Sequence, residues 1–191
     1  MIFATNNENK LKELQDIFND KNIKCLKDYN INIDIPETGK TFYENALIKA
    51  KAIYELTKIP TIADDSGLIF EELIDFPGIY THRIEEDAKK LGLTRNEYLI
   101  KKGQELKNKS IKAICTLVYY DGKDILSAQG EMHGTITDKE YPGNGFGFDS
   151  IFKLHDGRII SSLTKDEKNH LSHRYNACIN LKKMLKENNK L

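Results

Sequence analysis

The chain has no excess of charge of either sign. Lys and Arg together number 29, as do Asp and Glu, so the formal net charge at pH 7 is zero. A neutral chain lacks the long-range attraction to nucleic acid or to an anionic membrane that a basic protein has. We therefore expect neither a nucleic-acid partner nor a membrane partner. Local clusters of lysine still allow small anions to bind.

Cysteine is scarce, and long apolar runs are missing. The three cysteines of the 191-residue chain, Cys25, Cys115 and Cys178, lie far apart and form no CxxC pair, so buried free thiols are expected. Their odd number and the lack of a signal peptide favour the cytoplasm. The apolar runs are far shorter than the ~18 residues that a membrane-spanning helix needs.

The chain also lacks internal repeats, low-complexity tracts and any clear linker. Its first third instead alternates between short apolar runs and helical periodicity. Strands are expected at 2–4, 23–26 and 61–63, and helices at 8–18 and 41–57. This alternation is typical of an α/β domain, and residues 1–191 are treated as one domain.

The rest of the chain combines helices with a hairpin. A helical pattern covers 85–103, broken near Gly92, with Thr94 in position to cap its second part. Two runs rich in β-branched and aromatic residues, 113–120 and 125–132, are separated by a turn signal. Ser172 is in position to cap the last helix. The polar tail from Lys186 onward is expected to fray.

Two adjacent carboxylates, Asp64 and Asp65, follow the apolar residues 61–63, and Ser66 comes next. We expect both acids at the exit of a strand, where their like charges shift each other's pKa unless a cation lies between them. Carboxylate oxygens are ligands that Mg²⁺ prefers. The alternative is a turn in which each Asp binds nearby backbone.

A polar segment separates the first strand from the first helix. It contains Thr5, Asn6 and Asn7, and Lys10 lies one turn into the helix. The start of a helix offers free N–H groups and partial positive charge, which favours phosphate binding. The alternative is a helix capped by Asn7, with a solvated lysine. The spaced glycines of a P-loop are missing.

The start of the second helix carries a further group of polar residues. Glu37 lies in the preceding loop, where it could ligate a metal, and Asn45 and Lys49 are four residues apart on one helix face. Such a face suits a phosphate. The alternative is an ordinary helix surface.

Two later segments could bind a flat ring. Gly145-Phe146-Gly147-Phe148-Asp149 places two aromatic rings between glycines, next to a carboxylate that could read the edge of a base. Lys168 and Ser172-His173-Arg174 could contact phosphates or a base carbonyl. A tight turn with buried aromatics and an ordinary polar surface are the alternatives.

No segment is decisive alone, but their order and spacing are specific. Together they resemble the noncanonical purine nucleoside triphosphate pyrophosphatases, also called the inosine triphosphatase or Ham1-like family, over nearly the whole chain. The matching segments are Thr5-x-Asn7-x-x-Lys10, the stretch from Glu37 to Ala50, Ala63-Asp64-Asp65-Ser66-Gly67-Leu68, Pro77-Gly78-Ile79-Tyr80, the stretch from Gly145 to Phe152, and the stretch from Glu167 to Arg174.

The resemblance implies a central mixed β-sheet flanked by helices, with two lobes and an active-site cleft. It implies cleavage of ITP, dITP and XTP to the monophosphate and pyrophosphate, and a homodimer. Asp65 would be the general base and a Mg²⁺ ligand, Glu37 the second ligand, and Asp64 a support. The implied triphosphate-binding residues are Thr5, Asn6, Asn7, Lys10 and Lys49. The implied nucleotide pocket consists of Ser66, Phe146, Gly147, Phe148, Asp149, Lys168, His173 and Arg174.

Three departures from the family pattern bear on specificity: Asn6 replaces a common glycine, Ser150 a common proline, and Tyr175-Asn176 a small residue. Two alternatives to the implied reaction stay open. One is a pyrophosphatase for other modified nucleotides, such as modified pyrimidines, and the other is a nucleotide-binding sensor without turnover. The presence of Glu37 and Asp65 favours an enzyme, because a sensor needs no carboxylate to activate water.

Overall fold

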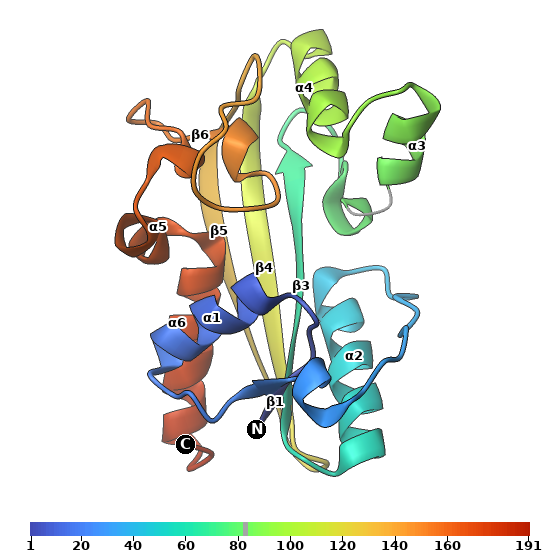
Figure 1. Ribbon diagram of the computed structural model, residues 1–191, viewed down its shortest axis with the longest axis vertical. Coiled ribbons are helices and arrows are strands. Elements are labelled where there is room, and N and C mark those ends of the chain that lie inside the picture. The colour runs from blue at the N-terminus through green and yellow to red at the C-terminus, as the bar shows by residue number, and fades with distance from the viewer. Residues whose placement is uncertain (82–83) are drawn as a thin grey trace. The chain divides into compact units, whose positions relative to one another are not determined.

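The computed structural model describes residues 1–81 and 84–191 (Figure 1). Its strands form a sheet with the order β2-β1-β3-β4-β5-β6. Strand β1 runs parallel to β2 and β3, whereas β5 and β6 are antiparallel, so the expected mixed sheet is confirmed. The strands are β1 (Ile2–Phe3), β2 (Lys24–Cys25), β3 (Thr61–Phe70), β4 (Ser110–Tyr120), β5 (Ile125–Ile136) and β6 (Phe152–Lys153). The α-helices are α1 (Glu8–Phe18), α2 (Phe42–Thr57), α3 (Ile84–Lys90), α4 (Arg95–Glu105), α5 (Lys165–Leu171) and α6 (His173–Glu187).

The chain divides into two compact units, which we describe separately. Unit 1 contains 1–66, 115–130 and 172–191, and unit 2 contains 67–114 and 131–171. Strands β3, β4 and β5 contribute residues to both units.

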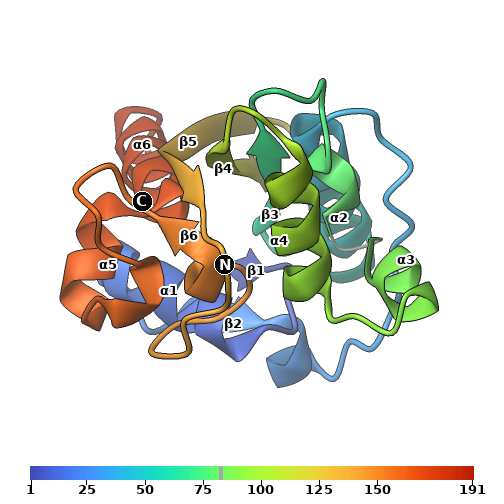
Figure 2. The ribbon, with the colours of Figure 1, turned by 90° about the horizontal axis from the view of Figure 1, so that it is seen from above.

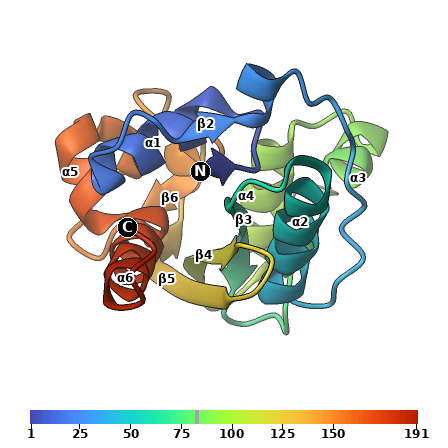
Figure 3. The same ribbon diagram turned by 90° about the horizontal axis from the view of Figure 1, so that it is seen from below.

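Unit 1 has a core on each face of its strands. One core contains Phe3, Ile62 and Leu117 and includes residues of α1 and α6, which pack together. The other contains residues of α2 and the strand neighbours of those three, Ile2, Ala63 and Val118. Successive strand residues point to opposite faces, which explains why adjacent residues belong to different cores. Figure 3 shows α2 across the strands from α6.

Unit 2 has one core, built from β3 to β6 and the helices beside them. Leu68 and Phe70 of β3 pack with Ile111 of β4, Ile136 of β5 and Leu99 of α4. Helices α3 and α4 lie side by side (Figure 2). Thr94 caps α4 and forms a reciprocal pair of hydrogen bonds with Glu97, which fixes where this helix begins.

The expected position of the acid pair was wrong in one respect. Strand β3 does not end at Ala63 but continues through both acids to Phe70. Asp64 and Asp65 are therefore consecutive strand residues and point to opposite faces of the sheet. They do not face each other as residues of a strand-end turn would.

The expectation for the C-terminal tail was also wrong. Helix α6 continues to Glu187, and Lys190 beyond it donates hydrogen bonds of 2.6 Å to both Asp121 and Asp124. These two carboxylates lie in the turn between β4 and β5. These ion pairs hold the C-terminal tail against the turn.

The expectation of buried free thiols is confirmed. Cys25, Cys115 and Cys178 are free and buried. None of the helices within 1–81 and 84–191 is both long and apolar enough to cross a membrane.

Candidate active site

Asp64 lies on the face of β3 that α1 and α6 cover. Its Oδ2 accepts a hydrogen bond of 2.8 Å from Lys10 Nζ and one of 3.0 Å from Ser66 Oγ, and the guanidinium of Arg174 lies 3.7 Å away. Burial favours the neutral acid, but Lys10, Arg174 and Lys49 outweigh it and hold the pKa of Asp64 well below its usual range. Asp64 is thus a permanently charged anchor for two cations.

Asp65 lies on the opposite face, toward α2. Its Oδ2 accepts a hydrogen bond of 3.0 Å from Asn45 Nδ2, and its Oδ1 accepts one of 3.0 Å from the backbone N–H of Ser66. Burial raises the pKa of Asp65 to about 6; Lys49 and Asn45 oppose this shift, and Glu37 and Asp64 add to it. A carboxyl group poised near neutral pH is suited to accept a proton from water.

Asn45 is a residue whose role the sequence pattern did not reveal. It is fully buried in α2, and besides holding Asp65 it accepts a hydrogen bond of 2.9 Å from the backbone N–H of Gly39. A Cβ on Gly39 would lie 2.7 Å from that same Asn45 oxygen, so a glycine is required for the close approach. Asn45 was expected on a phosphate-binding helix face. In the structure its amide instead orients the carboxylate of Asp65.

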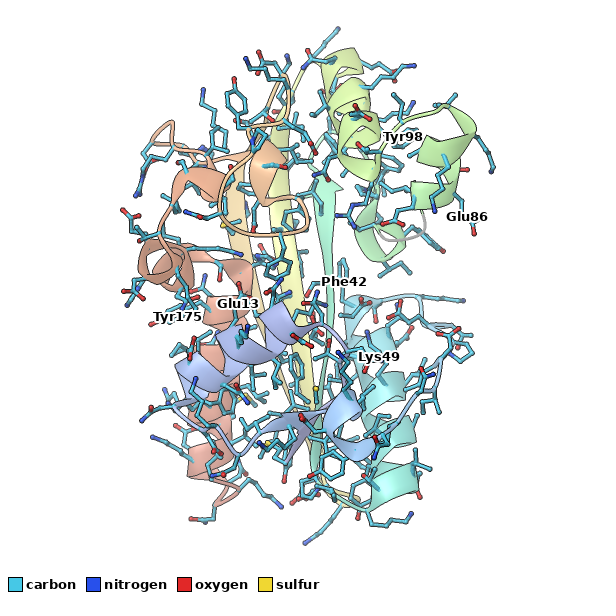
Figure 4. The ribbon with its side chains drawn as sticks, viewed as in Figure 1. Glu13, Phe42, Lys49, Glu86, Tyr98 and Tyr175 are labelled. Carbon is cyan, nitrogen blue, oxygen red and sulfur yellow. The ribbon has the colours of Figure 1, made fainter. Side chains whose placement is uncertain are left out.

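Lys49 and Glu37 form an ion pair at this end of α2. Lys49 Nζ lies 2.7 Å from Glu37 Oε1, and both side chains are mostly buried. Burial alone would lower the pKa of Lys49, but Asp64, Asp65 and Glu37 raise it above its usual value. Figure 4 marks Lys49 on α2. Lys49 is therefore a firm positive charge beside Asp65.

The residues present fit a magnesium ion in their chemistry. Among the residues that the structure describes, no three His, Cys, Asp or Glu side chains are gathered into a metal cluster. Mg²⁺, however, is commonly held by one or two carboxylates together with substrate phosphates and water. Glu37 and Asp65 offer that number of carboxylates, and the raised pKa of Asp65 indicates a carboxylate that a further cation would stabilise.

The segment before α1 is organised around the start of that helix. Asn7 Oδ1 accepts hydrogen bonds from the backbone N–H groups of Asn9 and Lys10, at 3.0 and 3.3 Å. Thr5 Oγ1 accepts one of 3.1 Å from the backbone N–H of Asn7. Asn7 is thus the expected helix cap, and Asn6 beside it is exposed to solvent.

Arg174 has a second partner that the sequence did not reveal. Its Nη1 donates a hydrogen bond of 2.7 Å to Oε2 of Glu13, which lies on α1 (Figure 4). Glu13 is buried, as are His173 and Arg174. At the start of α6, a Cβ on Gly130 would lie 2.1 Å from the carbonyl oxygen of His173. The missing side chain lets α6 approach β5 closely.

Residues 143–150, which we call the aromatic loop, belong to unit 2. Asp149 Oδ2 accepts hydrogen bonds of 2.7 Å from both the backbone N–H of Phe146 and Lys168 Nζ. The same ammonium group lies 4.4 Å from the centre of the Phe146 ring, within cation–π range. A pocket of about 260 Å³ is lined by Asn96, Ser161 and most of this loop, whereas Phe148 packs against the core of unit 2. The structure thus brings three of the expected site residues together: the ring of Phe146, the ammonium group of Lys168 and the carboxylate of Asp149.

The fold and the acidic, lysine-flanked centre define an α/β protein of the kind used in phosphate chemistry. A family model described as the Ham1 family matches residues 1–184. The chain belongs to this family.

Similar proteins cover nearly the whole chain. A dITP/XTP pyrophosphatase from Aquifex aeolicus is 36% identical over 97% of this chain and 96% of its own length. One from Borrelia duttonii is 39% identical, with the same coverage of each chain. The structure of a HAM1 protein from Coxiella burnetii matches with a TM-score of 0.83 and 30% identity, covering 97% of this chain and 98% of that one.

Proposed function

We propose that this protein hydrolyses noncanonical purine nucleoside triphosphates, ITP, dITP and XTP, to the monophosphate and pyrophosphate. The observation that carries the proposal is the contrast between the two acids. Asp64 is fixed in its charged form, whereas the carboxyl group of Asp65 has a pKa of about 6 and lies among Lys49, Asn45 and Glu37. The proposal is supported by the relatives of this family that are named dITP/XTP pyrophosphatases.

In this proposal Asp65 accepts the proton of the attacking water, and Asn45 holds its carboxylate in position. Lys10 and Lys49 bind the phosphates, together with the polar segment Thr5-Asn6-Asn7. Water attacks the α-phosphorus, the bond to the β-phosphate oxygen breaks, and pyrophosphate leaves. The proton passes from the water to Asp65.

The charges of unit 1 favour a divalent cation as cofactor. Among the residues that the structure describes, the ion-pair network of these acids contains three cations, Lys10, Lys49 and Arg174, and four carboxylates. These carboxylates belong to Glu13, Glu37, Asp64 and Asp65. The balance of minus one would repel a triphosphate, which carries about four negative charges. We propose that Glu37 and Asp65 hold Mg²⁺, which would activate the water and neutralise phosphate charge when bound.

Selection of the base is proposed to rest on the aromatic loop and on three candidate donors. Phe146 and Phe148 provide ring faces, and Lys168, His173 and Arg174 are the candidate donors to the carbonyl at position six of the purine. Adenine carries an amino group there, which would face a donor and leave both groups unpaired.

We also propose a homodimer in the cytoplasm. The homodimer rests on the family resemblance, and the cytoplasmic setting is supported by the three free, buried cysteines. Sedimentation equilibrium would test the dimer; a monomer mass at micromolar concentration would exclude it.

The activity is tested by offering ITP, dITP, XTP, ATP, GTP and dUTP with Mg²⁺ and measuring both products. We expect rapid release of monophosphate and pyrophosphate from the first three only. Equal rates with ATP and ITP would exclude the proposed role, and preference for dUTP would favour the pyrimidine alternative. Binding without turnover would favour the sensor.

A pair of variants controls this assay. Asp65→Asn should abolish turnover but retain nucleotide binding, because it keeps the shape of the side chain and removes the base. Asp34→Asn makes the same change at an exposed loop position and should leave turnover unchanged. Activity retained by Asp65→Asn would remove this residue as the base.

A further inference from the structure

The aromatic loop of unit 2 is anchored firmly where it begins. The backbone N–H of Asn144 donates a hydrogen bond of 2.7 Å to the carbonyl of Ser161, and Asn144 Nδ2 donates one of 3.3 Å to the carbonyl of Leu163. Gly143 lies so close that a Cβ there would be 2.4 Å from the same Ser161 oxygen. This end of the loop has little freedom.

The other end is anchored through Asp149, whose carboxylate binds the backbone of Phe146 and the ammonium of Lys168. The backbone N–H of Asp149 also donates a hydrogen bond of 3.3 Å to the carbonyl of Phe146. These contacts close the loop on itself. None of these contacts involves Gly147, which lies at the tip of the loop between the two aromatic residues.

Gly147 has a left-handed backbone with φ of 70°, and the space where a Cβ would lie is open to 4 Å. Gly147 is also exposed to solvent. Its carbonyl accepts a hydrogen bond of 3.0 Å from Nδ2 of Asn96, and the same amide group donates one of 3.2 Å to Ser150 Oγ. One side chain thus joins the tip of the loop to its end.

Asn96 is well placed for this role. It is the second residue of α4, two positions after the cap at Thr94, and the buried Leu99 and Ile100 fix the next turn in the core of unit 2. Asn96 is separated from Gly147 by 51 positions, so the contact depends on the tertiary fold. The start of α4 thus holds the backbone of Gly147 through this side chain.

We propose that Asn96 is a positioning residue for nucleotide recognition: by holding Gly147 and Ser150 it fixes Phe146 and Phe148 relative to Asp149 and Lys168. This inference rests on the proposed function. Asn96 acts before the substrate arrives, by reducing the conformations among which the free loop is distributed. Its loss should weaken nucleotide binding more than the chemical step, because the acids of unit 1 are unchanged.

The test uses Asn96→Ala and Asn96→Asp, with Gln104→Ala as the matched control. Asn96→Asp keeps the size of the side chain but removes the donor to Gly147, while Ser150 can still donate to it. Gln104 is an exposed amide of the same helix, bonded to Lys109 Nζ at 3.1 Å. Two readouts are needed, steady-state kinetics with ITP and hydrogen exchange of the loop amides.

For Asn96→Ala we expect KM for ITP to rise about five- to thirtyfold, as loss of one or two neutral hydrogen bonds predicts. The kcat should stay within about twofold, and the preference for ITP over ATP should fall. Asn96→Asp should raise KM at least as much, because it places a carboxylate oxygen against the carbonyl of Gly147. The control should change neither parameter, and all three variants should keep the far-ultraviolet circular dichroism of the wild type.

Amide exchange at 146–149 should be faster in Asn96→Ala than in the control. Unchanged KM together with unchanged exchange would overturn the proposal, as would a fall in kcat at constant KM. If the wild type cleaves no nucleotide, the proposed function fails, and exchange alone decides whether Asn96 holds the loop. Loop exchange in Asn96→Ala equal to that of the Gln104→Ala control would then exclude the proposed role of Asn96.

Discussion

Asp65→Asn should make the metal-free protein more stable at neutral pH, although it removes the proposed base. The reason is the pKa of Asp65, which is raised from 3.8 to about 6 in the folded protein. For such an acid, the stability associated with the neutral form is fully present below pH 3.8 and is lost as the pH rises through about 6. An asparagine has no charge to bury.

The size of the effect follows from the two pKa values. Ionised Asp65 lowers the free energy of unfolding by about 3 kcal/mol at pH 7.5 and by about 1 kcal/mol at pH 4.5. The variant loses the hydrogen bond from the backbone N–H of Ser66, which costs ~1 kcal/mol. We therefore expect a gain of about 2 kcal/mol at pH 7.5, or about 4–8 °C in Tm, and no gain at pH 4.5.

The assay is urea unfolding with EDTA at the two pH values. Asp64→Asn is the matched control, because the same change one residue along removes a carboxylate whose pKa is held low by Lys10 and Arg174. Asp64 contributes stability above pH 3.8 that is lost only at very acidic pH, so its variant should be less stable at both pH values. An Asp65→Asn variant that is less stable than wild type at pH 7.5, or whose difference does not vary with pH, would refute the reasoning.

Two further predictions concern the lysines. Lys49→Ala removes the cation that opposes the raised pKa of Asp65. We therefore expect kcat/KM for ITP to fall roughly ten- to hundredfold, and the acidic limb of the pH profile to move to higher pH. Unchanged kinetics and an unmoved limb would exclude this role of Lys49. Lys190→Ala should lower the urea midpoint by an amount that shrinks in high salt, because its ammonium binds two carboxylates at the turn after β4; Lys186→Ala, an exposed position on α6, is the control, and an equal midpoint in both variants would contradict the prediction.

Local signals in the sequence were sufficient to predict most of the fold. The caps at Asn7, Thr94 and Ser172 were predictable because each side chain binds backbone two or three residues away. The alternating strands and helices were predictable because each buries a periodic apolar face. The mixed sheet, by contrast, was expected from the family resemblance, and the structure confirms it.

The acid pair shows where local reasoning fails. Two adjacent acids argue against a continuing strand, since burying both is costly unless cations reach them. Lys10 lies 54 positions from Asp64, and the Asn45 amide lies 20 from Asp65. The strand is stable through the acids because distant helices supply these partners on opposite faces. Recognition that β3 continues would have predicted the different environments of the two acids.

The pair of Glu13 and Arg174 was missed for the same reason. The two residues are 161 positions apart, near opposite ends of the chain, and meet because α1 packs against α6. Glu13 lies in a helix with many charged residues, so its sequence context does not predict that it is buried. The roles of the site residues themselves stay predictions that activity measurements must test.

In the proposed reaction, water attacks the α-phosphorus and pyrophosphate is released. The most direct measurement is turnover of ITP with Mg²⁺ in water enriched in oxygen-18, followed by mass spectrometry of both products. Attack at the α-phosphorus places one heavy oxygen in the inosine monophosphate and none in the pyrophosphate. Label in pyrophosphate, or labelled orthophosphate with inosine diphosphate, would contradict it.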